Sequence, residues 1–435
     1  MTAATQGKIQ QQKRGFRLFF IIWLGDFFST IGSGLTAFAL GVYAFKLTGH
    51  ATSATMVVFF TFFPAFVLRP FGGVLADRID RKVLMLLGNL GSAFGTGVII
   101  MLLPQTQHTL FWLYPGIALT SVFVALQNPA YKASLTDFLP KTIYAQASGL
   151  MQLSNSAQFL IAPVLAGFLL SIISIKFLLL IDIFTFLLSA AAVAIATFLC
   201  KKFPTIQSQE HQDLFSELKD GFKIIYKTKG VFILVILVSV LLFYAGLLQA
   251  LLAPLVLSFT NSTVLGTLQS VCGVGMLLSS VLISVMKRNK KNSFILSISL
   301  ALMGLSFSFI GMRPSIWFIL LPGFLFFLVI PFANSSIDVL IRQNIDNRQQ
   351  GRVWALISLI TYAGAMIAYA IAGFLADKIF NPLLMPNGAL AQTLGHVFGV
   401  GPGRGIALIF FISGMLVILV SFFIARSKSI HQLDT

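Results

Sequence analysis

The feature that most constrains this chain is a series of long apolar runs. An apolar run of about 18 residues or more can cross the hydrocarbon core of a bilayer as a helix. Only 10% of the 435 residues are charged, whereas a soluble domain carries about 25% charged residues. The sequence therefore predicts an all-α membrane protein. Twelve transmembrane helices are expected, at residues 17–45, 52–76, 83–103, 110–130, 145–171, 177–200, 230–258, 264–286, 293–312, 316–336, 351–376 and 405–425.

The loops between these spans predict the topology. The longest polar stretch, residues 201–229, divides the chain into two bundles of six helices, 1–200 and 230–435. Loops on the side of the N-terminus hold 24 of the 30 Lys and Arg residues, and loops on the opposite side hold 5. Because cytoplasmic loops carry an excess of Lys and Arg, we expect both termini to be cytoplasmic. Within the 201–229 linker, residues 216–227 are expected to form an amphipathic helix along the membrane surface.

The two bundles are related by a weak internal repeat. A shift of 206 positions places "AGFLL" at 166–170 on "AGFLA" at 372–376, and Asn128 on Asn334. Two similar six-helix halves within one chain are typical of transporters whose substrate site lies near the bilayer midplane between the halves. We therefore expect two pseudo-symmetric bundles that give alternating access to a central cavity.

The turn between the second and third spans carries a motif. Residues 73–82 read "GVLADRIDRK", which resembles the G-x-x-x-D-R-x-G-R-[RK] signature of the major facilitator superfamily at the position where that family has it. Asp80 replaces the usual glycine, and this form resembles the branch of drug and siderophore exporters that includes macrolide-efflux and enterobactin-export proteins. Residues 128–150, 341–356 and 380–408 resemble later loops of that branch. The resemblance covers essentially the whole chain.

The resemblance implies the major facilitator fold, a bacterial cytoplasmic membrane and a secondary transporter without a cofactor. It also implies that the turn acts as a cytoplasmic conformational latch, made of Gly73, Asp77, Arg78, Arg81 and Lys82. Apart from the resemblance, Asp77 can accept hydrogen bonds at a neighbouring helix N-terminus, where the helix dipole favours an acid. The three basic residues can face anionic lipid.

Small residues are placed for close helix packing. The fifth span carries "APVLAG" at 162–167, in which Pro163 and Gly167 match an antiporter signature of the same family. Gly373 lies in the repeated "AGFLA" segment. Glycine and alanine allow helix backbones to approach closely in a membrane. The match to the antiporter signature favours export.

Three ionisable side chains lie inside the predicted spans: Asp26, Asp182 and Arg69. A charge at the bilayer centre costs at least about 2.5–3.5 kcal/mol, so such residues usually face the bundle interior or a wet cavity. Asp26 lies about 13 Å from the inner end of its span, near the midplane. It is the main candidate for binding a coupling proton or a positive group of a substrate. The alternative is a structural role, as a partner of Arg69 or of a hydroxyl on a neighbouring helix.

The other two ionisable residues have similar alternatives. Asp182 lies about one and a half turns from the outer end of the sixth span, where it either takes part in coupling or reaches the outer interface and pairs with Lys176. Arg69 lies about two turns from the inner end of the second span. It is either an inner gate residue or a long side chain that reaches lipid phosphate.

Polar residues on five of the spans are candidates for lining a cavity. Because many aromatic residues accompany them, we expect a bulky amphipathic substrate rather than a sugar. The candidates are Ser33, Gln127, Asn128, Gln152, Asn155, Gln158, Gln249 and Tyr362. Each of them is alternatively an interhelical hydrogen-bond partner.

Other classes of protein fit the sequence less well. The five histidines and two cysteines form no metal-ligand or catalytic motif, and no G-x-x-x-x-G-K-[ST] loop is present, so we expect neither an enzyme nor a metal site. The glycines of 399–405 are expected to reverse the chain. The net charge of +17 is spread over short loops, so a nucleic-acid partner is not expected.

The sequence therefore predicts a monomeric secondary transporter, in which protons, a small-molecule substrate and membrane lipids are the partners. The most favoured function is proton-coupled export of a drug or a siderophore-like metabolite. Import of a nutrient or siderophore by the same fold is the alternative.

Overall fold

The computed structural model describes residues 3–103, 106–139, 143–199, 222–223, 226, 229–285, 291–345 and 350–434. The side chains of 3–14, 69–78, 107–109, 135–138, 350–352 and a few single positions are outside the description. This part of the chain is helical and contains no strand. Twelve long helices occur in it, one for each predicted span. Eleven of them are long and apolar enough to cross a membrane. The remaining one, α5, has 26 residues and carries Gln152, Asn155 and Gln158.

The chain forms two compact units. Unit 1 comprises Met1–Thr48 and Val57–Gln209. In it, α1 packs against α5 and α6, and α3 packs against α4 and α6. Leu40, Leu113 and Leu178 meet in one apolar cluster, and each is at most 2% exposed. The helices are α1 (Ala3–Thr48), α2 (Ala51–Arg78), α3 (Arg81–Met101), α4 (Leu113–Phe138), α5 (Tyr144–Leu169) and α6 (Ile175–Leu199), with the short η1 (Gln107–Trp112) before α4.

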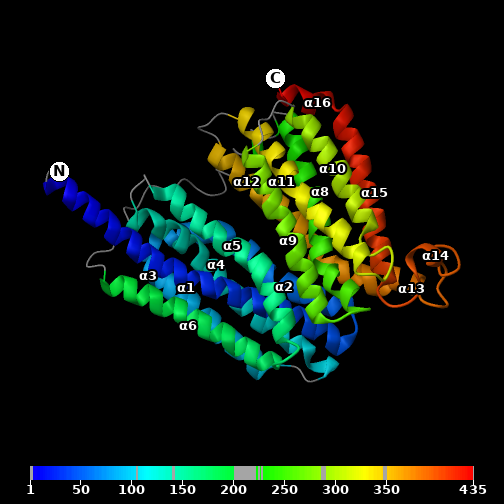
Figure 1. The fold of residues 1–435 in the computed structure, drawn as a ribbon, viewed down its shortest axis with the longest axis horizontal. Helices are drawn as coiled ribbons and strands as arrows, with labels where there is room; N and C mark the ends of the chain where they lie inside the picture. The colour runs from blue at the N-terminus through cyan, green and yellow to red at the C-terminus, as the bar shows by residue number, and fades with distance from the viewer. Residues whose placement is uncertain are drawn as a thin grey trace. The chain divides into compact units, whose positions relative to one another are not determined.

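Unit 2 comprises Gly49–Met56 and Glu210–Thr435. In it, α8 packs against α12, α11 packs against α9 and α10, and α15 lies beside α10 (Figure 1). The short α13 and α14 project from one end of this unit (Figure 1). The helices are α8 (Lys229–Leu257), α9 (Ser262–Val285), α10 (Asn292–Phe309), α11 (Trp317–Gln343), α12 (Gln350–Phe374), η3 (Leu375–Phe380), α13 (Asn381–Leu383), α14 (Gly395–Phe398), α15 (Arg404–Arg426), α16 (Lys428–His431) and η4 (Gln432–Asp434).

The two units repeat the same helix neighbours. The pairs α3–α4, α1–α5 and α3–α6 of unit 1 correspond to α10–α11, α8–α12 and α10–α15 of unit 2. The described helices differ at another pair, because α1 and α6 pack along their length whereas α8 and α15 touch only sparsely. Glycines explain the close α1–α6 packing: a Cβ on Gly25 would lie 2.8 Å from the Cβ of Ala192, and one on Gly32 would overlap Oγ1 of Thr185. Small residues allow this approach.

The boundary between the units falls inside α2. Its first residues, up to Met56, belong to unit 2, and the rest of the helix belongs to unit 1. Asp377 of η3 holds this first turn, since its carboxylate accepts hydrogen bonds from Ala51 N at 3.0 Å, Thr52 N at 2.8 Å and Thr52 Oγ1 at 2.7 Å. The first four N–H groups of a helix have no partner within it, and an acid stabilises that end. Asp377 is therefore the cap of α2.

The C-terminal residues close the polar end of unit 2 in the same way. Asp434 accepts from Asn292 N at 2.8 Å and Ser293 N at 3.1 Å, which caps α10. Asn344 Nδ2 donates to the Leu433 carbonyl oxygen at 2.9 Å. The segment after α15 thus ties the ends of α10 and α11 together.

Residues 399–405 form a turn before α15, as predicted. Gly399, Gly401 and Gly403 have φ values of 83°, 125° and 77°, a region that only glycine adopts without strain. Arg404 follows and is 3% exposed. Its guanidinium donates to the Gly311 carbonyl oxygen at 3.3 Å and stacks 5.5 Å from the centre of the Phe259 ring. Arg404 is therefore a buried anchor of this turn and not a free charge in a loop.

Candidate functional site

Asp26 lies on α1 with the Tyr131 hydroxyl of α4 as its polar neighbour. The Asp26 side chain is partly exposed, whereas Tyr131 is 5% exposed. The hydroxyl lies close enough to interact with the carboxylate, although it forms no hydrogen bond of standard geometry. A phenol can donate to a carboxylate and can accept from a protonated carboxyl group. The Tyr131 hydroxyl can therefore interact with Asp26 in either protonation state of the carboxyl group.

Aromatic packing fixes the backbone around Asp26. Trp23, one turn earlier on α1, donates from Nε1 to the Leu150 carbonyl oxygen of α5 at 2.7 Å. Its ring lies 5.4 Å from that of Phe27. The indole bond joins α1 to α5 close to the acid. The carboxyl group thus lies on a part of α1 that is bonded to α5.

Asp182 of α6 lies in a different environment. It is 1% exposed and faces Gly32 and Thr36 of α1. The Thr185 hydroxyl donates to the Asp182 carbonyl oxygen at 2.8 Å and lies 3.4 Å from Oδ1, while Oδ2 has no hydrogen bond of standard geometry. The neighbours of its carboxylate are the hydroxyl groups of Thr36 and Thr185. Asp182 therefore lies inside the α1–α6 packing and does not extend to the outer interface.

The predicted latch is only partly described. The last part of α2 carries Gly73, Asp77 and Arg78, and their side chains are outside the description. The same is true of the side chain of Arg69, earlier in α2. Asp80 is the N-cap of α3: it accepts from Lys82 N at 3.0 Å and lies 3.6 Å from Lys82 Nζ.

The structure thus gives a reason for the unusual acid of the motif. Aspartate caps a helix well, whereas the glycine found in other members has no side chain to do so. Arg81 and Lys82 form the first turn of α3, and both side chains are partly buried.

The cavity candidates of unit 1 fall into two groups. Gln127 is 8% exposed and packs against Gly88, and Gln158 packs against Gly34. The positions of these two amides and of the partly exposed Ser33 agree with the alternative interpretation, in which they make contacts between helices and do not line a cavity. The exposed residues are Asn128, Gln152 and Asn155. Gln152 and Asn155 are three residues apart on α5 and share one face of that helix.

In unit 2, the two candidates belong to one polar cluster. The Tyr369 hydroxyl of α12 donates a short hydrogen bond to Oε1 of Gln249 on α8, and Tyr362 interacts electrostatically with Tyr369 from the same helix. Gln249 and Tyr362 are exposed, whereas Tyr369 is 5% exposed. Tyr369 therefore connects the two candidates: it is bonded to Gln249 and lies near Tyr362.

Sequence reasoning missed Tyr131, Tyr369, Thr36 and Thr185. A usable signal existed for the tyrosines, because each lies in a span close to a polar residue already selected. Asn128 and Tyr131 are three residues apart, and Tyr362 and Tyr369 are seven apart, which in each case places them on one helix face. The threonines carry no such signal, since hydroxyls commonly bond within their own helix.

The predicted packing residues lie at helix contacts. Ala162, beside Pro163, meets Gly34 of α1, where an added Cβ would lie 2.7 Å from the Ala162 Cβ. Gly167 is buried. A Cβ on Gly373 would overlap Thr52 of α2. Among the described residues, no group of three or more His, Cys, Asp or Glu side chains is placed to hold a metal ion.

A family model and several curated proteins match this sequence. The model described as Major Facilitator Superfamily matches residues 22–369. Macrolide efflux protein A of Streptococcus pyogenes is 24% identical over 371 residues, which cover 83% of this chain and 90% of that protein. The uncharacterized MFS-type transporter YfiS of Bacillus subtilis is 24% identical over 423 residues, covering 93% and 91%. Multidrug resistance protein MdtG of Yersinia enterocolitica is 28% identical over 160 residues, covering 35% and 37%.

Solved structures share the fold at low identity. A bacterial homolog of the human lysosomal transporter Spinster, inward-facing and unoccupied, has a TM-score of 0.70 at 12% identity, covering 97% of this chain and 98% of that chain. The nucleoside transporter NupG has a TM-score of 0.70 at 16% identity, covering 94% and 100%. The resemblance seen in the sequence is thereby confirmed. This multi-pass membrane protein, a transporter rather than an enzyme, belongs to the Major Facilitator Superfamily.

Proposed function

We propose that this protein is a proton-coupled exporter of a bulky amphipathic compound, either a drug or a siderophore-like metabolite. The observation that carries the proposal is the partly exposed Asp26 beside Tyr131, an acid inside a membrane span next to a phenol that can donate to it or accept from it. The names of similar proteins support export, since macrolide efflux and multidrug resistance proteins are among them. Exposed amides on α5 and the Gln249–Tyr362–Tyr369 cluster suit a large, mildly polar substrate.

The mechanism assigns one role to each group. Asp26 binds a proton from the outer side and releases it to the inner side, and the Tyr131 hydroxyl interacts with the carboxyl group in both protonation states. The bundles 1–200 and 230–435 rock around the substrate, tethered by 201–229, whose expected amphipathic helix lies almost wholly outside the described residues. The latch formed by residues 73–82 on the cytoplasmic side favours one of the two conformations between which the bundles rock. Asp182 supports the α1–α6 contact, and Arg69 acts at the inner gate.

The proposal includes a location and an orientation. The excess of Lys and Arg on one side of the chain places both termini in the cytoplasm, and the family branch indicates a bacterial cytoplasmic membrane. The protein acts as a monomer, because each chain contains both bundles.

The test uses proteoliposomes with an internal pH indicator and an imposed pH gradient. Wild type should give a proton flux that depends on an added substrate, such as a macrolide. Asp26→Asn should abolish it, while Asp338→Asn should leave it unchanged, since Asp338 is an exposed acid paired with Arg342 at 2.8 Å. Equal flux in wild type and Asp26→Asn would contradict the role of Asp26.

The sign of the same flux separates export from import. Protons that move against the substrate mean antiport and export, whereas protons that move with it mean symport and support the importer. A wild-type protein that transports substrate without moving protons would overturn proton coupling but not the transport function.

A further inference from the structure

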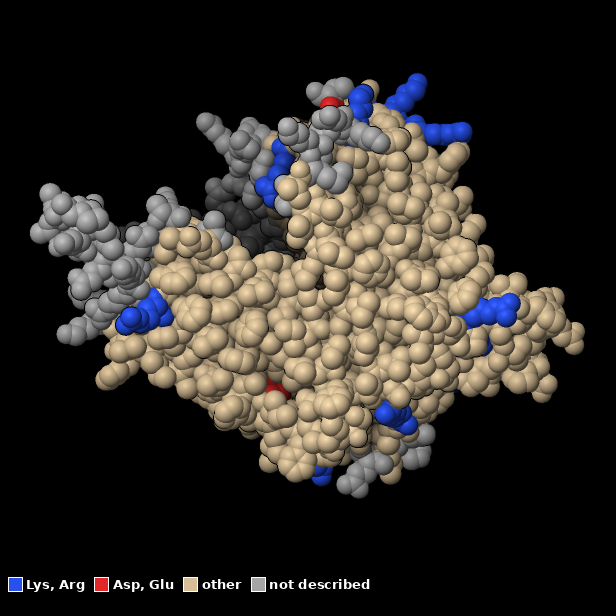
Figure 2. All heavy atoms as spheres, in the orientation of Figure 1, with Lys and Arg blue, Asp and Glu red and all other residues tan. Residues whose placement is uncertain are grey.

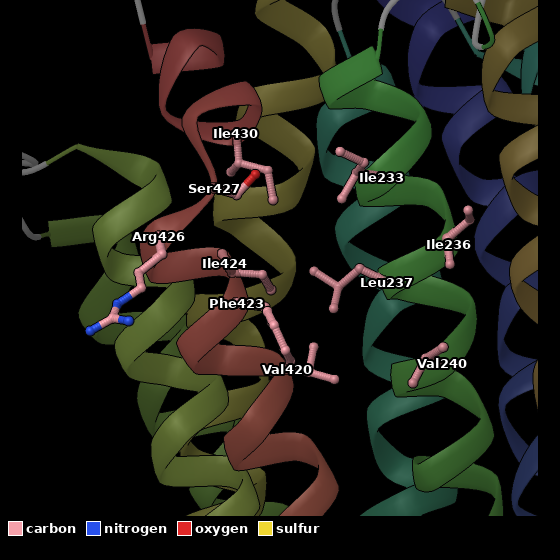
Figure 3. A pocket seen from close by; sticks show the side chains of 10 residues that line it. All are labelled: Ile233, Ile236, Leu237, Val240, Val420, Phe423, Ile424, Arg426, Ser427 and Ile430. Carbon is pink, nitrogen blue, oxygen red and sulfur yellow. The ribbon is translucent and has the colours of Figure 1, made fainter.

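A groove of about 520 Å³ runs along unit 2 between α8 and α15. Ile233, Ile236 and Leu237 of α8 form one wall, and Val420 and Phe423 of α15 form the other (Figure 3). Its volume lies in the range of about 300–1,000 Å³ that is usual for sites binding small molecules. The walls are apolar, so the groove fits a hydrocarbon chain.

The groove lies where the internal symmetry is broken. In unit 1, the equivalent helices α1 and α6 close on each other through Gly25 and Gly32. In unit 2, branched side chains such as Ile233 and Ile236 occupy the α8 wall and hold α15 away. Because membrane helices pack closely where small residues allow it, the large side chains of the α8 wall leave a space between α8 and α15 that can hold another molecule.

The depth of the groove matches one leaflet. Ile233 and Val240 are 4 and 11 residues from the start of α8 at Lys229, which places the groove about 6–17 Å along the helix. One half of a bilayer's hydrocarbon core is about 15 Å thick. α16 closes the polar end, where Ser429 and Leu433 pack on Gly230.

Basic side chains surround this polar end. Arg426 lines the groove, and its guanidinium turns away from α8 and lies 4.1 Å from the centre of the Phe422 ring (Figure 3). Lys428 is exposed two residues later. A second pocket, of about 530 Å³, is lined by Lys291 and His431. Ile430 lines the groove and His431 lines the second pocket, so the two hollows flank α16.

The charge at this end of unit 2 is one-sided. Lys and Arg side chains gather over the end where the C-terminus lies (Figure 2). Neither Arg426 nor Lys428 has an acidic partner in the described part of the chain. The nearby Asp434 carboxylate accepts hydrogen bonds from backbone amides at the start of α10. This corner is therefore complementary to a negative group at the membrane surface.

We propose that the corner binds an anionic phospholipid, with one acyl chain in the groove and the phosphate held by Arg426, Lys428 and Lys291. The lipid takes the place that close α1–α6 packing has in unit 1, and so stabilises α8 against α15. Each basic residue near an anionic lipid surface strengthens binding by about fivefold. An anionic headgroup is thus preferred over a zwitterionic one.

The test is native mass spectrometry of the full-length protein in a mild detergent with equal amounts of phosphatidylglycerol and phosphatidylethanolamine. Wild type should retain phosphatidylglycerol at least about fivefold better. Arg426→Gln should lose about fivefold in retention, and the double change with Lys428→Gln about 25-fold. Arg313→Gln is the matched control, since Arg313 is an exposed arginine at the opposite end of unit 2, and it should retain lipid like wild type.

A second arm tests the groove itself. Ile236→Trp fills the groove and should remove the bound lipid although all basic residues remain. Leu419→Trp changes a residue that is 52% exposed on α15 outside the groove and should retain lipid. Equal retention of both lipids by wild type, or full retention by Arg426→Gln and Ile236→Trp, would overturn the proposal. Displacement of the lipid by inorganic phosphate would also overturn it, because it would indicate a site for soluble anions.

Discussion

At the scale of single residues, two acids in neighbouring helices of one unit have contrasting surroundings. Asp26 is partly exposed beside a phenol, whereas Asp182 is 1% exposed among threonines and Gly32. A coupling group has to meet solvent from each side in turn, and of these two acids Asp26 has the more exposed side chain. Asp182 is better suited to hold α1 and α6 in register.

The two buried tyrosines should fail in different ways when their hydroxyls are removed. Tyr131→Phe removes the polar neighbour of Asp26, and the loss of an interaction comparable to a hydrogen bond, about 0.5–1.5 kcal/mol, should lower the maximal proton-coupled flux by about threefold to tenfold. Tyr369→Phe removes the bond to Gln249. It should raise the substrate concentration at half-maximal flux and leave the proton-to-substrate ratio unchanged. Flux titrations of both variants check this, and identical effects of the two would contradict it.

Gly32 should tolerate no side chain. The Cβ of Gly32→Ala would overlap Thr185 Oγ1 and lie 2.8 Å from Asp182 Oδ1, so overpacking should cost about 1–3 kcal/mol. Gly41 on the same helix has no atom within 4 Å of an added Cβ. Gly41→Ala should be neutral, or stabilising by up to about 1 kcal/mol, because alanine is the better helix former. Thermal unfolding in detergent measures both; equal midpoints for the two variants would contradict the packing argument.

At the scale of helices, the aspartate caps Asp377 and Asp434 stabilise two helices with different positions in the molecule. Asp377→Ala and Asp434→Ala each remove a carboxylate from a helix N-terminus, which should cost about 0.5–2 kcal/mol of stability. α10 lies within unit 2, whereas α2 continues from unit 2 into unit 1. Asp377→Ala should therefore also change the distribution between conformations, measured by accessibility of an introduced cysteine to a membrane-impermeant reagent. An equal change in accessibility in Asp434→Ala would contradict this distinction.

Long apolar runs predicted every long helix, because crossing a bilayer is decided by hydrophobicity summed over a whole segment. Helix ends were less predictable: α1 begins at Ala3 rather than near residue 17, and α11 continues to Gln343 rather than 336. Polar residues such as Gln and Lys are good helix formers, so a helix does not have to end where its apolar run ends.

The candidate site could be predicted only in part. Asp26 was recognisable because an acid in an apolar run is unusual on its own. Its neighbour Tyr131 and the Thr36–Asp182 contact depend on which helices are neighbours, and on their rotation. Apolar periodicity is weak in helices that are apolar on all sides, so the sequence does not give that rotation. The same applies to the cap of α2 by Asp377, which joins residues more than 300 positions apart.

At the scale of the whole molecule, alternating access requires the two units to move as bodies while each keeps its internal distances. Fluorescent labels at Lys176→Cys and Arg313→Cys, one on each unit, should show at least two distance populations in single-molecule energy transfer. Labels at Arg313→Cys and Lys378→Cys, both on unit 2, should show one. The background is Cys200→Ser with Cys272→Ala, because Cys272 is buried and a small apolar residue suits its place.

A substrate can shift such an equilibrium only by its difference in affinity for the two states. A tenfold preference, about 1.4 kcal/mol, should therefore change the population ratio up to tenfold at saturation. The ratio for the pair across the units should change with substrate and with pH, and Asp26→Asn should remove the pH response while the substrate response persists. A single, unchanging distance across the units in a protein that still transports would contradict rocking of the bundles and would require a pathway contained within one unit.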